Sequence, residues 1–516
     1  MLETAKGRKG VVTSPHRLAT QAGLEVLKEG GTAVEAAVAT AAALVVLYPH
    51  MNSLGGDGFW LISEPGKPPH GVESCGRAGS AATLDLYRGQ GLSAVPRRGP
   101  LAANTVAGVV SGWQTALTVV PDRRLPLKRL LAPAIAMAEE GVPTAGHLSA
   151  ALTEHRDNFS RQPGFAGAFL NDPDVLHQPR LAATLRRLSE AGLDDFYRGD
   201  VGRAVAADLE ALGAPVSLAD IEAHKAIRVR PLELRTGGDS LVNLPPPTQG
   251  FASLLILGLF DRLGVRTAEG FEHIHGLIEA TKLAFIIRDR HIGDPDHSDF
   301  DPQAALNNDA LLDHMARAIN PERALQWPLR APGGDTVWFG AMDEAGRAAS
   351  VIQSIFEPFG SGVVLPQTGV LWQNRGTSFQ LNEAGWNALR PGRRPFHTLN
   401  PALAQLRDGR LMAYGTMGGN GQPQTQGAVF TRYARFGQDL QASISAPRWR
   451  LDTDSLKIES RVPESVLAAL AAAGHQIELA PPMTSMMGHA GALVRLPDGG
   501  FEGATDPRSD GAALAY

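Results

Sequence analysis

An unbroken run of small and apolar residues, Ala36 to Tyr48, constrains the fold of this chain more than any other feature. The run reads AAVATAAALVVLY, which is shorter than the ~20 residues that a helix needs to span a bilayer. A helix that is apolar on every side must be buried, and alanine-rich helices pack closely against sheets. We therefore predict a buried helix packed on a β-sheet, and no membrane segment.

Turn-forming residues divide the rest of the chain into helical and extended segments. Gly30-Gly31 separates the buried run from a polar-faced helix over Leu24 to Lys28. In SLGGDGFWLIS, paired glycines relieve backbone crowding ahead of an alternating strand. Helical patterns dominate from Leu125 to Leu212, whereas two β-rich runs flank the turn at Asp343. These patterns predict a mixed α/β fold.

Charge and cysteine content exclude several classes of protein. The formal net charge is −5, with no basic run interleaved with aromatic residues, so nucleic acid is not an expected partner. The single cysteine, Cys75, cannot form an internal disulfide, which fits a reducing compartment. The start, MLETAKGRKG, lacks the apolar core of a signal peptide. We expect a cytoplasmic protein with no membrane partner.

Common hydrolase motifs are missing from the sequence, and the remaining candidates are weak. There is no G-x-S-x-G, H-E-x-x-H or Walker A pattern. Cys75 could be a thiol nucleophile, although a buried cysteine more often acts as a small hydrophobic residue. The acidic segment from His291 to Asp301 could bind a cation, but it follows a helix and lacks calcium-loop spacing. We expect no metal and no cofactor.

A threonine at the head of a predicted strand offers another kind of nucleophile. Thr336 follows the segment PLRAPGGD, which is rich in glycine and proline, and begins the run TVWFGAM. Its hydroxyl is a weak nucleophile, but a free α-amine with a pKa near ~8 on the same residue would supply a base. Such an enzyme must first cut the Asp335–Thr336 bond. Taken alone, an Asp-Thr pair before a strand more commonly marks the end of a loop.

Motifs along the whole chain resemble those of the gamma-glutamyltransferase family, which belongs to the N-terminal-nucleophile hydrolases. The first half carries SPHRLATQAGLEVLKEGGTAVEAAVATAAAL, PHMNSLGGDGFWLI, LLAPAIAMAEEGVP, LPPPTQGF and EATKLAFIIRDRHIGDPD. The second half carries GDTVWFGAMDEAG, FGSGVVLPQTGVL, RPFHTLNPALA, MGGNGQPQ, APRW and GATDPRSDGAALAY. The order and spacing of these motifs make the resemblance specific.

The resemblance implies a four-layer αββα sandwich made by self-cleavage into two subunits that stay together. The large subunit would span residues 1–335 and the small subunit residues 336–516, and an oligomer of such heterodimers is compatible with the family. Thr336 matches the family nucleophile, and Ser354 matches a hydroxyl that supports it. Gly418 and Gly419 match a glycine pair whose amides form the oxyanion hole, although two glycines alone more often mark a turn.

Binding of the donor substrate is where the sequence keeps one family residue and changes others. Arg77 matches an arginine that holds the donor's α-carboxylate, and a guanidinium fork suits that role. Arg375 and Ser378 stand where the family has an amide and an acidic residue that grip the donor's α-ammonium. Further departures from the family pattern are Val337, Phe356, His397 and Thr398.

These departures imply a donor that carries a carboxylate but needs no α-ammonium group, such as oxamate or a glutaryl amide. The predicted function is therefore a self-processing amidohydrolase or acyltransferase that acts on a small amide, as in the oxamate amidohydrolase and cephalosporin acylase branch of the family. True gamma-glutamyl transfer or glutathione hydrolysis is the first alternative, because Arg77 and the glycine pair are retained. An uncleaved relative that binds a metabolite without catalysis is the second.

Overall fold

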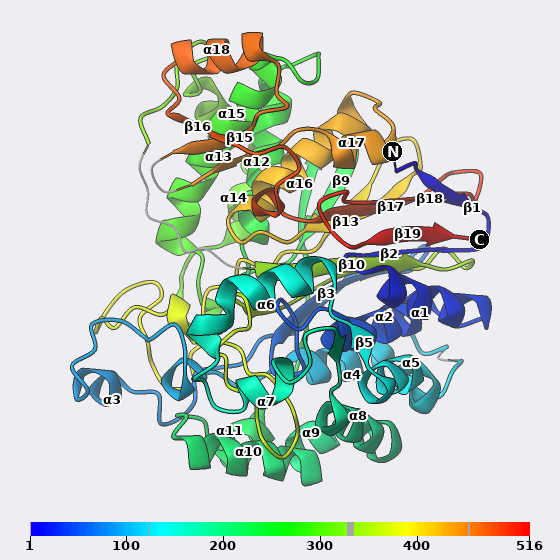
Figure 1. Ribbon diagram of the computed structural model, residues 1–516. Coiled ribbons are helices and arrows are strands. Elements are labelled where there is room, and N and C mark those ends of the chain that lie inside the picture. Colours follow the sequence, from blue (N-terminus) through cyan, green and yellow to red (C-terminus); the bar gives the residue numbers. More distant parts are fainter. Residues whose placement is uncertain (1, 123, 328–334, 453–454) are drawn as a thin grey trace.

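The computed structural model describes residues 2–122, 124–327, 335–452 and 455–516, and its centre is a pair of facing β-sheets (Figure 1). Each sheet has seven strands, and all neighbouring strands within it are antiparallel. The β10 sheet contains, in spatial order, β19 (Ala512–Ala515), β2 (Val11–Ser14), β10 (Asp335–Met342), β11 (Ala348–Phe356), β3 (Asp57–Ser63), β4 (His70–Ser74) and β7 (Ile227–Val229). The β13 sheet contains β1 (Ala5–Gly7), β18 (Phe501–Thr505), β17 (Ala490–Arg495), β13 (Leu411–Thr416), β12 (Ala402–Gln405), β9 (Asp239–Asn243) and β8 (Leu232–Thr236).

Helices cover the outer face of each sheet. The β10 sheet is covered by α1 (Arg17–Lys28), α2 (Ala33–Leu47) and α4 (Val109–Val119), with α5 (Leu127–Glu140) and α8 (Pro179–Ala191) outside them. The β13 sheet is covered by α12 (Gly250–Arg262), α16 (Gly421–Phe430) and α17 (Leu440–Ser445), with α13 (Phe271–His291) packed on α12. The mixed α/β fold predicted from the sequence is confirmed.

Shorter elements surround these layers. In the first half they are α3 (Leu84–Arg88), α6 (Gly146–Phe159), α7 (Phe165–Phe169), α9 (Asp195–Arg198), α10 (Asp200–Leu212) and α11 (Leu218–Ala223), with the strand pair β5 (Val142–Pro143) and β6 (Val175–Leu176). Beyond α13 come α14 (Pro302–Leu306), α15 (Asp309–Arg317) and α18 (Glu464–Ala472), with the small sheet β14 (Trp449–Leu451), β15 (Leu456–Glu459) and β16 (Ile477–Ala480). The first helices of the chain and those of its middle section therefore lie on opposite sides of the sheets (Figure 1).

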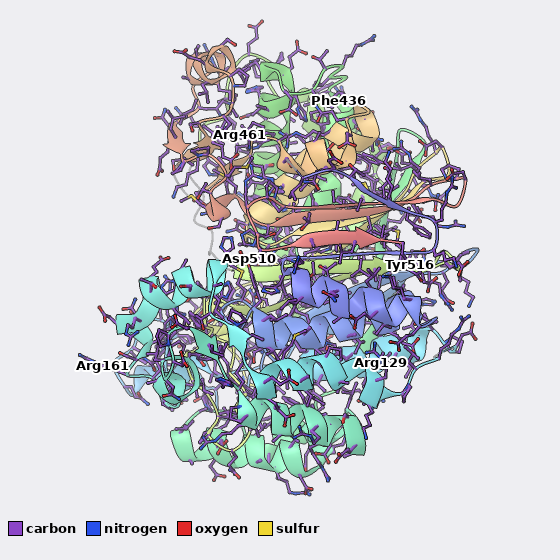
Figure 2. All side chains as sticks on the ribbon, turned by 45° about the vertical axis from the view of Figure 1, so that its right-hand side comes forward. Arg129, Arg161, Phe436, Arg461, Asp510 and Tyr516 are labelled. Carbon is purple, nitrogen blue, oxygen red and sulfur yellow. The ribbon has the colours of Figure 1, made fainter. Side chains whose placement is uncertain are left out.

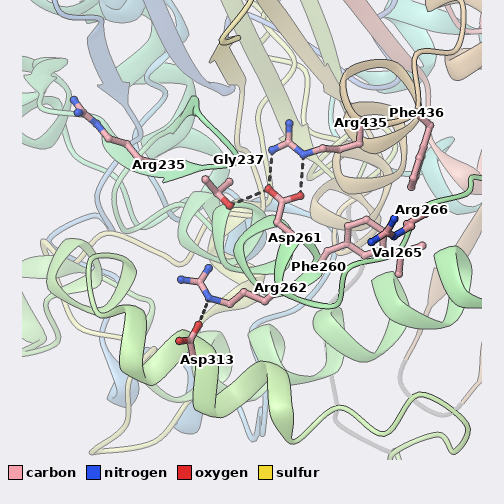
Figure 3. Close-up of a pocket in the computed structure, with 11 residues that line it drawn as sticks. Arg235, Gly237, Phe260, Asp261, Arg262, Val265, Arg266, Asp313, Arg435 and Phe436 are labelled. Atoms are coloured by element: carbon pink, nitrogen blue, oxygen red, sulfur yellow. Dashed lines mark hydrogen bonds and ion pairs between the residues drawn. The ribbon is translucent and has the colours of Figure 1, made fainter.

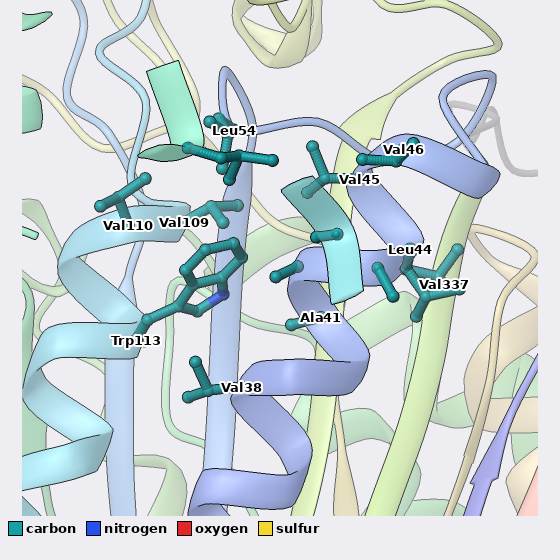
Figure 4. Packing of buried hydrophobic residues seen from close by; sticks show 14 of the residues in the cluster. Val38, Ala41, Leu44, Val45, Val46, Leu54, Val109, Val110, Trp113 and Val337 are labelled. Carbon is teal, nitrogen blue, oxygen red and sulfur yellow. The ribbon is translucent and has the colours of Figure 1, made fainter. Parts of the chain in front are cut away.

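The predicted buried helix is α2, and all its residues are buried. Gly30, with φ +85°, ends the preceding helix, and Thr32 and Glu35 form a reciprocal capping box that starts α2. Small side chains let the helix approach both the β10 sheet and α4. In Figure 4, Val38 and Ala41 lie beside Trp113 of α4, and Leu44 lies near Val337 of β10.

Residues on either side of position 336 are interleaved in both sheets. In the β10 sheet, β10 pairs with β2 on one side and with β11 on the other, and β19 near the C-terminus pairs with β2. Figure 2 shows Tyr516 at the end of this last strand, where its hydroxyl donates to the carbonyl oxygen of Leu27 on α1. Position 336 therefore does not separate two independently packed domains.

Membrane insertion by a helix has no support in the described parts of the chain. None of the helices placed there is long and apolar enough to cross a bilayer. The run that is most apolar in sequence is enclosed between a sheet and other helices.

Tight packing of α2 against α4 predicts that a larger side chain at Ala41 destabilises the fold. Ala41→Leu adds methylene groups where exposure is 0%, and overpacking of this kind costs about 1–3 kcal/mol. Gln21→Leu on the exposed face of α1 is the matched control. Urea unfolding should show a lower free energy of unfolding for Ala41→Leu than for the control. Equal stability of the two variants would contradict this description of the packing.

Candidate active site around Thr336

Thr336 lies at an irregularity in the pairing of β10 with β11. Asp335 pairs with Phe356 and Val337 pairs with Gln353, so the register shifts at Thr336. Such bulges bend a strand and redirect a side chain. The Thr336 hydroxyl donates a hydrogen bond to Ser354 Oγ at 3.3 Å, and Thr336 is 1% exposed. The structure therefore brings together the two hydroxyls that the sequence analysis selected.

The chain after Ser354 adopts a strained conformation that supports this pair. Phe356 has φ +81°, a conformation that costs a non-glycine residue free energy and often marks a functional site. Its backbone amide donates to Ser354 Oγ at 2.8 Å. A Cβ on Gly56 would lie 2.3 Å from the carbonyl oxygen of Ser354. Gly56 therefore relieves the backbone crowding that the sequence predicted there.

Gly418 and Gly419 form the turn between β13 and α16. Their φ angles are +122° and +55°, which side chains rarely allow. The amide of Gly421 donates to Gly418 O at 2.8 Å, whereas the amides of Gly418 and Gly419 donate to no partner within the described part of the chain. Two free amides in a strand-to-helix turn have the chemistry of an oxyanion hole.

The side chain of Gln249, at the start of α12, joins this turn to the segment that contains His397 and Thr398. Gln249 Nε2 donates to the carbonyl oxygens of Thr398 at 2.6 Å and Gly419 at 2.9 Å. The buried guanidinium of Arg288 then donates to Gln249 Oε1 at 2.8 Å. Two motifs that carry the family resemblance, LPPPTQGF and the stretch around Arg288, thus position the glycine turn from α12 and α13.

Arg375 is buried beside the strained residue that follows Ser354. It is 1% exposed, and its guanidinium carbon lies 4.0 Å from the centre of the Phe356 ring. Its terminal nitrogens, Nη1 and Nη2, have no hydrogen-bond partner among the described residues. Burial lowers the pKa of Arg375 to about 10, so it is still a cation at neutral pH. A buried cation with free donors is costly and favours an anionic ligand.

The other residues predicted to bind substrate lie in two nearby segments. Ser378 shares a 3-10 turn, Arg375–Ser378, with the arginine, and its hydroxyl oxygen has no partner in the part of the chain that is described. The same holds for the Thr398 hydroxyl. Burial and the Arg375 cation lower the pKa of His397 to about 4, so its ring is neutral. Arg375 therefore provides the positive charge here.

Asp57 is a buried carboxylate of this site that the sequence analysis did not select. It stands opposite Ser354 in the register of β3 and β11, and its Oδ1 accepts from Gly76 N at 2.9 Å and Gln373 Nε2 at 3.1 Å. Its Oδ2 lies 3.3 Å from His397 Nε2 without hydrogen-bond alignment, so we regard this contact as electrostatic. An aspartate inside a buried strand segment, SLGGDGFWLIS, was the sequence signal for it.

Arg77 lies in a network of charges, in contrast to Arg375. Its Nη1 donates to Gly392 O at 2.9 Å and its Nη2 to Asp296 Oδ2 at 3.1 Å. It lines a cavity of about 260 Å³ together with Cys75 and Arg394. Arg77 is therefore already engaged, and it would have to exchange Asp296 for a donor carboxylate in order to fill its predicted role.

The two weaker candidates have structural roles. Cys75 is buried, and burial raises the pKa of its thiol well above the usual value, which disfavours the nucleophilic thiolate. In the acidic segment, Asp294 accepts from Arg394 Nε at 2.8 Å, and Asp301 caps α14 by accepting from Ala304 N at 2.9 Å. The segment includes a short 3-10 turn after α13, which fits its interpretation as a helix-end turn.

A large cavity elsewhere on the molecule contains none of these residues. It has a volume of about 740 Å³ and lies around the C-terminal end of α12 (Figure 3). Arg435 pairs with Asp261 and Arg262 pairs with Asp313 along its wall. Cavity size alone does not identify the site around Thr336.

Comparison with known proteins agrees with the geometry. The chain is 50% identical over 522 residues to the oxamate amidohydrolase proenzyme of Klebsiella pneumoniae subsp. pneumoniae, covering 98% of each chain. It is 35% identical to the glutathione hydrolase-like YwrD proenzyme of Bacillus subtilis, covering 100% of both. Among solved structures, cephalosporin acylase from Bacillus halodurans superimposes with a TM-score of 0.93 at 31% identity, covering 100% of this chain and 97% of that one.

The family assignment rests on nearly the whole chain. Residues 19–516 match the gamma-glutamyltranspeptidase family, a range that includes every residue of the candidate site. The chain therefore belongs to the gamma-glutamyltranspeptidase family of enzymes.

Proposed function

We propose that this protein is a self-processing amidohydrolase that uses Thr336 to cleave a small amide bearing a carboxylate, with oxamate as the favoured substrate. The observation that carries the proposal is the buried Arg375, whose free Nη1 and Nη2 lie next to the segment that supports the Thr336–Ser354 pair. A carboxylate bound there would supply the partner that this cation lacks.

Maturation is the first step of the proposed mechanism. Thr336 Oγ1 attacks the carbonyl carbon of Asp335, its proton passes to the departing nitrogen, and the C–N bond breaks to leave an ester on Thr336. Water then hydrolyses that ester, giving a new carboxylate on Asp335 and a free amine on Thr336. The products are a large subunit, residues 1–335, and a small subunit, residues 336–516, in an αββα fold of the N-terminal-nucleophile type. The word proenzyme in the names of the relatives supports this processing.

Turnover then uses the groups that maturation has released. The free amine of Thr336 takes the hydroxyl proton as Oγ1 attacks the amide carbon of oxamate, and ammonia leaves with that proton. Water hydrolyses the resulting oxalyl ester and releases oxalate. Ser354, which accepts hydrogen bonds from Thr336 and Phe356, orients the nucleophile.

The Gly418 and Gly419 amides are proposed to stabilise the tetrahedral oxyanion in both reactions. One such donor contributes ~3 kcal/mol to the transition state when it is fixed in advance. The contacts of Gln249 with Gly419 O and with the buried Arg288 supply that rigidity. The neutral His397 and the Asp57 carboxylate lie on the same side as Arg375 and limit the net charge around the donor.

The identity of the donor follows from charge balance around Arg375. Oxamate offers a carboxylate directly beside its amide and has no ammonium group, so it matches a cationic site. A glutaryl amide places the carboxylate further from the reacting carbon and is the second donor of this class. The relative that is named for oxamate hydrolysis shares 50% of its residues with this chain, and the glutathione hydrolase-like relative shares 35%.

Gamma-glutamyl hydrolysis or transfer is the alternative function. Arg77 is the observation that favours it, because a guanidinium that is 47% exposed beside a cavity could accept the α-carboxylate of a larger donor. The α-ammonium of that donor would then have to tolerate Arg375. This conflict of charges is why oxamate is preferred.

Replacement of Thr336 tests maturation. Thr336→Ala should give a single full-length chain on a denaturing gel, because both the attacking oxygen and the later nucleophile are missing. Thr336→Ser keeps a hydroxyl and should still produce two fragments, more slowly. Wild-type protein should give fragments that correspond to residues 1–335 and 336–516. Cleavage of Thr336→Ala at the same bond would contradict the assignment.

Replacement of Arg375 tests the carboxylate site. Arg375→Met removes a charge-assisted pair worth ~1.5–3 kcal/mol, so the KM for oxamate should rise about ten- to a hundredfold. Because the guanidinium has two free buried nitrogens, the thermal midpoint should stay unchanged or rise. Arg161→Met, at an exposed position, is the control. A fall in stability without a change in KM would show that Arg375 is structural.

Donor preference tests the reading of the altered clamp. Wild type should release ammonia from oxamate with a higher kcat/KM than it releases product from a gamma-glutamyl anilide, since Arg375 repels an α-ammonium group. The double change Arg375→Gln with Ser378→Asp should shift preference toward the gamma-glutamyl donor. A strong wild-type preference for the gamma-glutamyl donor would overturn the proposal of oxamate and favour the role of Arg77.

A further inference from the structure

The stretch that precedes the proposed cleavage site is held by side chains and not by secondary structure. Residues 320–327, which we call the arm, form neither a helix nor a strand. The amide of Ala324 donates to Ala473 O at 2.8 Å, and Trp327 Nε1 donates to Asp452 O at 2.8 Å. Both acceptors belong to the proposed small subunit, so the arm joins the two products of cleavage.

A buried ion pair on α13 holds the main chain of the arm. Lys282 Nζ donates to Glu279 Oε1 at 2.7 Å, and the two residues are 2% and 3% exposed. Lys282 also donates to Leu325 O at 2.7 Å, while Leu325 N donates to Glu279 Oε2 at 2.9 Å. The Leu325 side chain is 43% exposed. The pair therefore binds the backbone of Leu325 on both sides and leaves its side chain in solvent.

Two histidines extend this contact toward the small subunit. His275, one turn before Glu279 on α13, donates from Nε2 to Asn320 O at 2.8 Å. Since a carbonyl can only accept, neutral His275 has an unprotonated Nδ1, which accepts from His475 Nε2 at 2.9 Å. Burial and the Lys282 ammonium lower the pKa of His475 to about 3, so its ring is neutral too. We call His275, Glu279, Lys282 and His475 the arm clamp.

Three members of the arm clamp have the residue types of zinc ligands. His275, Glu279 and His475 offer ligand atoms within 4.8 Å of one another. However, the Lys282 ammonium already occupies Glu279 Oε1, and Leu325 N occupies Oε2. A metal ion would have to displace a cation and free the arm. The contacts therefore favour a grip on the backbone over a metal site.

We propose that the arm clamp is a positioning device for self-cleavage, which holds the arm so that the Asp335–Thr336 bond stays close to the Thr336 hydroxyl. This inference rests on the proposed function. With Trp327 and β10 both held, only residues 328–334 separate two fixed points. Without the clamp, the free segment would begin after α15 and its 3-10 end, near residue 318. Loop-closure entropy alone then predicts a ~4-fold loss in cleavage rate, and lost orientation adds to it.

A buried ion pair is an expensive way to stabilise a fold, which supports a positioning role. Well-packed apolar residues of similar volume often stabilise a protein as much as a buried pair does. They cannot bind a carbonyl and an amide of the same residue in one register. The paired charges of Glu279 and Lys282 thus provide specificity for the backbone at Leu325.

The experiment removes both charges together so that folding is preserved. Glu279→Leu with Lys282→Met replaces the pair by apolar side chains, whereas Lys128→Met, on the exposed face of α5, is the control. Freshly expressed full-length precursor is followed on denaturing gels for the rate of self-cleavage. Hydrogen–deuterium exchange of a peptide covering residues 320–327 reports the arm directly, and kcat is measured per mole of cleaved chain.

The double variant should cleave about four- to tenfold more slowly than wild type. Its 320–327 peptide should exchange faster, and its kcat per cleaved chain should equal that of wild type. A wild-type cleavage rate together with faster exchange would overturn the positioning role, and unchanged exchange would overturn the clamp itself. If wild type does not cleave at all, the proposed function falls and the positioning role falls with it. The exchange result still shows separately whether the clamp holds the arm.

Discussion

The pairing of β10 with β11 is the interaction on which the rest of this structure depends. It carries the register shift that turns Thr336 toward Ser354, and it lies in the middle of the β10 sheet. Val337, the next residue, is 0% exposed and packs in the same cluster as Leu44 of α2. The alanine-rich helix is therefore needed because the strand that carries the nucleophile must be covered closely and rigidly.

Charge is distributed unevenly around this centre, and the uneven distribution has functional meaning. The buried Arg288 and Arg394 donate to protein oxygens, whereas the terminal nitrogens of Arg375 have no partner among the described residues. A protein gains nothing in stability from an unpaired buried cation. We infer that Arg375 is kept for a ligand, and that the paired arginines are kept to position the backbone around it.

Local patterns predicted much of the fold, because they depend on neighbours in sequence. The capped helix after Gly30, the strand after Gly56 and the hairpin around Asp343 all occur as expected. The candidate site was less accessible to such reasoning. Whether Arg77 or Arg375 is free depends on Asp296 and Gly392, residues distant in sequence that the fold brings to Arg77. The position of Asp57 opposite Ser354 likewise follows only from strand register.

The central claim is that Thr336 forms a covalent oxalyl ester held near Arg375. Intact-mass spectrometry of wild-type enzyme, mixed with oxamate and quenched in acid within milliseconds, tests it directly. The fragment of residues 336–516 should gain the mass of one oxalyl group, and fragmentation should locate it on the oxygen of Thr336. Ammonia release with the added mass on another residue, or on the fragment of residues 1–335, would contradict the account.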